Sequence, residues 1–394
     1  MRMGGWMSEG RVDKSKKTEE RHPIRSFLSF ALMLAAVLLV VLFAAYRDGT
    51  GFDILRRYLH YGRAEQVGGE TVYHYEAASR NRFAVLGEAL VVLSDASLSV
   101  LGSGGEEVWS TPVTMTSPAL VSGGGRAVAY DVGGTALYVV DQTGLLLALT
   151  ADEEEPYISA TLNKNGQLAV TAQKRGYKGS VKVYGRTPGP EPVFEFKSSQ
   201  RFVSDGYVLG DTLAAVTLGQ ENGVFVSNIV LYRMPGEDPA ANYSVTGGLV
   251  AAIGEQEGRL VTVSDSVLTC AGTGGEISGS YSYGGSYLRD YDLGGTGFTA
   301  LLLNRYRSGS VGRLVTVGKD GEVIGSLDVR EEVLSLSASG RYLAVLYPDH
   351  LVVYNQDLQP YATLQGTGDA REALMRPDGS ALLLSSGSAS LFLP

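Results

Sequence analysis

Two hydrophobic patterns divide the chain. Residues 27–46 form a continuous apolar run of twenty residues without a charge, which at about 1.5 Å per residue matches the roughly 30 Å hydrocarbon core of a bilayer. After residue 70 no long helical period appears, and short apolar runs of β character follow one another. The pattern predicts one transmembrane helix followed by an all-β region.

A glycine followed by a short mixed stretch and an apolar run recurs eight times after residue 70, at intervals of 38 to 48 residues. Glycine suits the tight turn of a hairpin, and a period near 40–45 residues is typical of four-stranded propeller blades. We therefore predict an all-β fold, a β-propeller of eight four-stranded blades. Seven blades is the alternative, because one interval is unusually long. The repeated glycines are Gly87, Gly125, Gly166, Gly210, Gly258, Gly297, Gly340 and Gly379.

The last repeat ends at Pro394 with three expected strands and no fourth. Residues 71–77, TVYHYEA, form a β run before the first repeat and are expected to supply the missing outer strand. Pairing of this kind closes the ring and removes an exposed sheet edge.

The patterns predict four segments: a basic tail (1–26), a transmembrane helix (27–46), a juxtamembrane segment (47–70) and a propeller (71–394). The apolar run is longer than the hydrophobic region of a signal peptide, which is the alternative. The tail has seven Lys and Arg against four acidic residues, so we expect a cytoplasmic N-terminus and an extracytoplasmic propeller in the cell membrane. Residues 51–66 have helical spacing and form either an amphipathic collar on the bilayer or a stalk.

Composition excludes several function classes. The net charge of −9 argues against nucleic-acid binding, and a single Cys excludes a disulfide framework. No catalytic constellation, zinc-ligand pair or phosphate-binding loop is found, so we predict neither an enzyme nor a cofactor or metal. His350 is interpreted as a solvated turn residue rather than a catalytic one. The acidic run at residues 152–155 is interpreted as a solvated loop, with calcium binding as the alternative.

The turn sequences Val317-Gly-Lys-Asp-Gly321 and Ser337-Ala-Ser-Gly340 carry a resemblance to known propellers. The first is similar to generic quinoprotein-like blades and the second to blades of periplasmic translocation propellers. Trp109 is the only Trp after the tail, so the regular tryptophans of quinoproteins are missing. The whole plan resembles an uncharacterised bacterial family of single-pass, membrane-anchored propellers, mostly from Gram-positive anaerobes, and this resemblance implies no activity.

Charged residues recur where the innermost strand of several repeats is expected to begin. Such positions surround the mouth of the channel, where we expect a protein or envelope-polymer partner to bind, with salt bridging between blades as the alternative. A tyrosine-rich stretch is a second candidate surface, or ordinary β composition. The candidate binding residues are Arg82, Arg201, Arg289, Asp290, Arg330, Glu331, Arg371, Glu372, Tyr281, Tyr283, Tyr287 and Tyr291.

The predicted function is that of a membrane-anchored extracytoplasmic binding or scaffolding module, held in the lipid bilayer by residues 27–46. The alternative is a propeller hydrolase or lyase that acts on cell-wall or polysaccharide material. Fold alone does not choose between them, because propellers support many activities.

Overall fold

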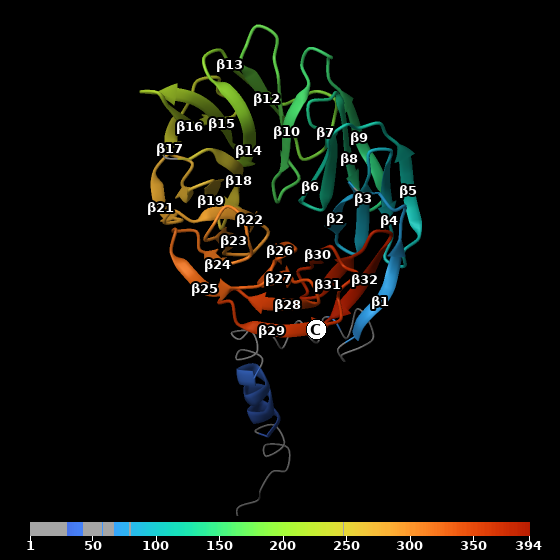
Figure 1. Ribbon diagram of the computed structural model, residues 1–394. Coiled ribbons are helices and arrows are strands. Elements are labelled where there is room, and N and C mark those ends of the chain that lie inside the picture. Colours follow the sequence, from blue (N-terminus) through green and yellow to red (C-terminus); the bar gives the residue numbers. More distant parts are fainter. Residues whose placement is uncertain (1–29, 42–56, 58–66, 79, 247) are drawn as a thin grey trace, which may run out of the picture. The chain divides into compact units, whose positions relative to one another are not determined.

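The computed structural model describes residues 30–41, 57, 67–78, 80–246 and 248–394 (Figure 1). The chain divides into two units, Met1–Ala64 and Glu65–Pro394. Residues 30–41 of the first unit are helical. Over the described residues, no helix has the length and apolar character needed to cross a membrane. The predicted tail and most of the predicted juxtamembrane segment lie outside the described residues, which include residues 57 and 67–70 of that segment.

The second unit is an eight-bladed β-propeller of eight four-stranded antiparallel sheets, which confirms the predicted fold and blade number. Figure 1 shows the blades following one another around a ring. The first four blades contain β2 (Arg82–Leu86), β3 (Ala89–Leu93), β4 (Ser97–Leu101) and β5 (Glu107–Pro112); β6 (Pro118–Gly123), β7 (Arg126–Asp131), β8 (Ala136–Asp141) and β9 (Gly144–Thr150); β10 (Tyr157–Leu162), β11 (Leu168–Ala172), β12 (Gly179–Tyr184) and β13 (Phe194–Ser198); and β14 (Phe202–Leu209), β15 (Thr212–Glu221), β16 (Val224–Arg233) and β17 (Ala241–Val245).

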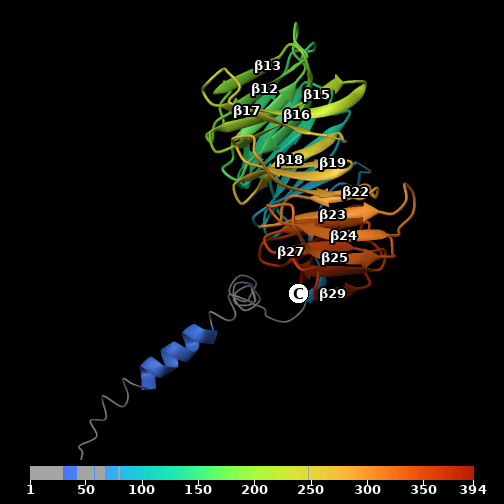
Figure 2. The same cartoon turned by 90° about the vertical axis from the view of Figure 1, so that its left-hand side faces the viewer.

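Blades 5 to 8 complete the ring, and Figure 2 shows blades 5 and 6 from the side, one below the other. These blades contain β18 (Val250–Gln256), β19 (Arg259–Ser264), β20 (Val267–Ala271) and β21 (Ile277–Ser282); β22 (Tyr287–Asp292), β23 (Thr299–Asn304), β24 (Gly312–Val317) and β25 (Val323–Val329); β26 (Ser335–Ser339), β27 (Tyr342–Leu346), β28 (His350–Asn355) and β29 (Pro360–Gln365); and β30 (Glu372–Met375), β31 (Ala381–Leu384), β32 (Ser388–Leu393) and β1 (Val67–His74).

The repeated glycines lie where the sequence predicts them, between the first and second strands of each blade. All eight have a positive φ, between 59° and 85°. An L residue with a side chain rarely adopts this backbone conformation, so glycine is the residue that lets these hairpins turn tightly. The strand that follows each glycine is almost continuously buried, as in β3, β27 and β31.

Ring closure also follows the prediction. β1 pairs antiparallel with β32, from Val67 opposite Leu393 to His74 opposite Ser388. The closing strand therefore begins four residues earlier than predicted and ends at His74. Tyr73 is only 1% exposed, and its hydroxyl donates to the Glu88 carbonyl of the neighbouring first blade at 2.5 Å. The N-terminal strand thus holds the last blade and the first together.

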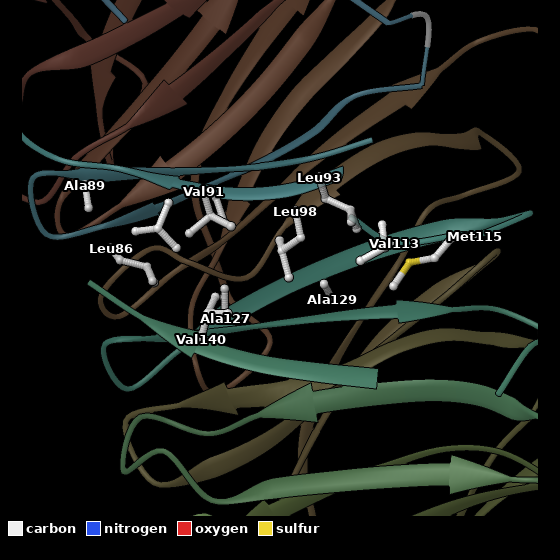
Figure 3. Close-up of a cluster of buried hydrophobic side chains, with 12 residues drawn as sticks. Leu86, Ala89, Val91, Leu93, Leu98, Val113, Met115, Ala127, Ala129 and Val140 are labelled. Carbon is white, nitrogen blue, oxygen red and sulfur yellow. The ribbon is translucent and has the colours of Figure 1, made fainter. Parts of the chain in front are cut away.

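The core consists of layers between blades rather than one central cluster. Eight buried apolar clusters correspond to the eight interfaces between neighbouring blades, including the interface of blade 8 with blade 1. Figure 3 shows one such layer, in which Leu86, Val91 and Leu98 of blade 1 meet Ala127 and Val140 of blade 2. Burial of both sheet faces explains the nearly continuous apolar runs of the middle strands.

Candidate functional site

The innermost strands β2, β6, β10, β14, β18, β22, β26 and β30 begin at one face of the ring, which we call the linker face because the links between blades enter there. The loops between the second and third strands of each blade lie at this face too, since strand direction alternates within an antiparallel blade. Residues from a link and from such a loop can therefore meet around one pocket.

A pocket of about 380 Å³ lies at the linker face between blades 6 and 7. Arg289 comes from β22, Asn304 from the end of β23, and Arg307 from the loop that follows. Glu331 and Glu332 come from the link between β25 and β26. Segments distant in the sequence thus place two cationic and two anionic side chains around one cavity.

The backbone around this pocket is held in place. Asn304 Nδ2 donates to the Gly309 carbonyl at 2.9 Å, and the Arg305 amide donates to the Val311 carbonyl at 2.9 Å, which together brace the loop. The Arg307 guanidinium lies 5.8 Å from the centroid of the Tyr287 ring, within cation–π range. These contacts fix the loop that carries Arg307.

The charged side chains of the pocket keep their hydrogen-bonding capacity. Within the described residues, no ion pair is formed by Arg289, Arg307, Glu331 or Glu332. Arg201, in contrast, donates to Glu221 at 2.5 Å. Arginine offers a planar fork of donors that matches a carboxylate, and glutamate offers acceptors for cations. The pocket is therefore suited to a ligand group that carries both charges.

The other predicted residues lie around the same face but not in the pocket. Arg82 is the first residue of β2, Arg201 immediately precedes β14, and Arg371 immediately precedes β30. Arg330 directly follows β25 and accepts a weak hydrogen bond on its carbonyl from Ser310 Oγ at 3.4 Å. The expectation that Arg289 and Asp290 precede their innermost strand is wrong, because both lie inside β22.

A backbone irregularity explains the place of Arg289. In β10, β14, β18 and β22 the strand register shifts by one residue near the strand start, so that one residue of each is left unpaired. Arg289 is this extra residue in β22. A β-bulge re-aims the side chain of the extra residue, and Arg289 is exposed and lines the pocket.

Acidic side chains lie near the starts of three innermost strands, and two of them are next to a bulge. Asp205 and Asp290 directly follow the bulge residues of blades 4 and 6, and Glu372 opens the innermost strand of blade 8. Burial is the main cause of the raised pKa of Glu372 and of Tyr291, and Asp290 and Asp205, respectively, raise these pKa values further from two blades away. The charges carried by these innermost strands therefore influence one another's ionisation.

Burial is the largest cause of the raised pKa values of these carboxyls. It raises the pKa of Asp205 to about 6, although the Ser159 hydroxyl and the Gly206 amide both donate to the carboxylate and oppose the shift. Burial also raises the pKa of Glu372 to about 7, against the lowering effect of Arg82. The pKa of Asp290 is raised for the same reason. Burial at these positions therefore disfavours the ionised form of each carboxyl.

The tyrosines of the tyrosine-rich stretch have two kinds of surroundings: three pack in or against a buried cluster, and one lies at the surface. Tyr283 is buried, and Tyr281 and Tyr291 pack against the cluster between blades 5 and 6. Tyr287 is 43% exposed and lies beside the pocket through its contact with Arg307.

The acidic run at residues 152–155 lies in the link between β9 and β10, where Glu155 pairs with Lys174 at 3.0 Å.

A cluster of metal-ligand type lies close to the pocket. Glu331, Asp349 and His350 each offer one ligand atom, and these atoms lie within 4.8 Å of one another. His350 is the first residue of β28 and is partly buried rather than fully solvated.

Sequence reasoning missed Arg307 and Asp205, because no local pattern marks a loop residue or a bulge that becomes important only after the blades assemble.

This geometry defines the class of protein, an eight-bladed β-propeller with a charged pocket at its linker face. A family model described as a family of unknown function (DUF5711) matches residues 63–255, slightly under half of the chain. This match agrees with the resemblance to an uncharacterised family. No curated protein matches the chain.

Several solved structures share the fold. The computationally designed protein Ika8 is 12% identical with a TM-score of 0.60, over 83% of this chain and 100% of that one. BamB from Moraxella catarrhalis is 13% identical with a TM-score of 0.51, over 83% and 98%. A quinohemoprotein alcohol dehydrogenase from Pseudomonas putida HK5 is 9% identical with a TM-score of 0.52, over 82% and 75%. At these identities the likeness shows the propeller fold alone.

Proposed function

We propose that this propeller is a binding or scaffolding module that recruits a protein partner through its linker face. The observation that carries the proposal is the pocket between blades 6 and 7, where Arg289, Arg307, Glu331 and Glu332 form no ion pairs within the described residues. Charged groups of both signs favour a protein or peptide, which carries both charges, over a polyanion.

The scaffold supports this role because the site rests on strands and on braced loops. Arg289 belongs to β22, whose blade is packed between two buried clusters. A side chain on such an element loses little further backbone freedom when a partner binds, which favours affinity. The pocket volume of about 380 Å³ suits a few side chains of a partner rather than a whole domain.

The proposal includes a membrane location. Residues 27–46 are apolar enough to serve as a single transmembrane anchor, and the basic tail favours a cytoplasmic N-terminus. The propeller would then face the extracytoplasmic side and meet other envelope proteins there.

The test is a crosslinking pull-down from native membranes with the full-length chain. We expect Arg289→Gln combined with Arg307→Gln to lose a specific partner while the melting temperature stays unchanged, because both side chains lie at the surface of the pocket. The matched control is Arg186→Gln with Arg233→Gln, which removes the same charge at exposed positions outside the pocket. The same partner set from both double variants would contradict the proposal.

A further inference from the structure

Three side chains with ligand atoms meet at the linker face of blade 7. Glu331 lies in the link between β25 and β26, Asp349 in the turn between β27 and β28, and His350 at the start of β28. One ligand atom from each lies within 4.8 Å of the others. Two chain segments therefore bring one imidazole and two carboxylates together.

The imidazole of His350 is held in one orientation. Its Nδ1 lies 2.6 Å from Asp349 Oδ1, and its ring stacks on Tyr347 with centroids 4.6 Å apart and planes 14° apart. The Tyr347 hydroxyl lies 3.4 Å from the Tyr354 hydroxyl in a buried contact, which fixes the stacking partner. The Asp349 carboxylate and the His350 imidazole therefore already face each other, and an ion bound at Nδ1 would lie between them in place of their direct contact.

The backbone that carries the two carboxylates is also pinned. The Tyr347 amide donates to the His350 carbonyl at 2.8 Å, and the Gly366 amide donates to the Asp349 carbonyl at 2.8 Å. On the other segment, the Leu334 amide donates to the Leu346 carbonyl at 2.8 Å and ties the link to β27. The ligand-bearing segments are therefore assembled before any ion arrives.

We infer that Glu331, Asp349 and His350 bind a divalent transition-metal ion of the zinc class. Imidazole nitrogen and carboxylate oxygen together suit such an ion, whereas calcium prefers oxygen ligands alone. Ligand atoms on a tetrahedral ion with bonds of about 2.1 Å lie about 3.4 Å apart, so only small rotations of the exposed carboxylates are needed.

The position of the ion connects it with the pocket. Three protein ligands leave one position of a tetrahedral zinc ion open. Glu331 also lines the pocket beside Arg289 and Arg307, so an acidic group of a ligand in the pocket is within reach of the open position. Metal binding by the three side chains does not depend on the proposed partner.

The test is calorimetric titration of the untagged full-length chain in detergent with Zn²⁺, together with elemental analysis after dialysis. We expect one ion per chain, with an affinity that falls by about tenfold or more in His350→Gln and in Glu331→Gln. The matched controls are Glu332→Gln, the neighbouring acid outside the cluster, and His74→Gln, an exposed histidine on β1; both should bind as the wild type does.

Two results would overturn the inference: no Zn²⁺ bound in the micromolar range, or binding that His350→Gln leaves unchanged. Circular dichroism checks that each variant folds, and Asp349→Asn, at an exposed position, replaces any variant that does not. Pull-downs repeated with and without a chelator show whether partner binding needs the ion. A chain that binds no Zn²⁺ but retains its partner would overturn this inference and leave the proposed function intact.

Discussion

Asp205 shows at the residue scale how blade assembly changes the chemistry of a side chain. Its carboxylate accepts from Ser159 of blade 3 at 2.7 Å and from the Gly206 amide at 2.9 Å. Both donors favour the ionised form, yet burial outweighs them and raises the pKa to about 6. A carboxyl of this kind is tolerated more easily when protonated.

The stability of the propeller should therefore depend on pH through this residue. The folded pKa of about 6 lies above the ordinary 3.8, so the stability contribution is present below about pH 3.8 and is lost as pH rises towards about 6. Asp205→Asn keeps an acceptor but carries no charge. At pH 8 it should raise the free energy of unfolding by about 1–2 kcal/mol, and near pH 4 the gain should vanish.

Melting temperatures of the wild type and of Asp205→Asn at pH 4 and pH 8 measure this difference. The exposed Asp238→Asn serves as the control and should change neither value by much. An equal change at both pH values in Asp205→Asn would show that the carboxyl does not titrate as argued.

At the element scale, β1 determines whether the ring is closed. It covers the edge of β32, and Tyr73 fills the cluster between blades 8 and 1. Arg376 Nη2 donates to the Tyr73 hydroxyl at 3.1 Å and to the Glu88 carbonyl at 3.2 Å, so the contact spans the closure. Without β1 the last blade presents an unpaired edge at β32, which still pairs with β31 on its other side.

Deletion of Val67–His74 should therefore destabilise the propeller by at least about 3 kcal/mol, since it removes a large buried aromatic side chain and a strand. Hydrogen exchange should accelerate first at those Ser388–Leu393 amides that face β1, because they lose their partner strand while the others still pair with β31. Deletion of eight residues from the tail, 8–15, is the control of equal length. Unchanged exchange in β32 after loss of β1 would contradict this role.

The sequence predicted these elements well and the pocket only in part, for a physical reason. A glycine at positive φ followed by a buried run is a local requirement of each hairpin, so the eight glycines predict the blades. The bulge at Arg289 leaves no local pattern, because it depends on pairing with β23. Arg307 and Glu331 are separated along the chain and meet only when a loop and a link lie at the same face.

At the scale of the whole molecule, eight similar interfaces join the blades into a closed ring, so each blade packs against a neighbour on both faces. Such a body needs no disulfide to be stable. Its single cysteine, Cys270, is buried between blades 5 and 6, where burial raises the pKa of its thiol to about 11. A thiol that is both buried and protonated reacts slowly with maleimides.

This property makes the proposed topology testable with single cysteines in an otherwise native chain. If the basic tail is retained in the cytoplasm, Thr187→Cys, in the exposed link between β12 and β13, faces the outside. A membrane-impermeant maleimide added to intact cells, stripped of their wall where one is present, should then label Thr187→Cys. Ser8→Cys, in the tail, should be labelled only after the membrane is permeabilised, and the wild type should stay unlabelled in both conditions. Labelling of Ser8→Cys in intact cells, with Thr187→Cys protected, would reverse the orientation and place the linker-face pocket in the cytoplasm.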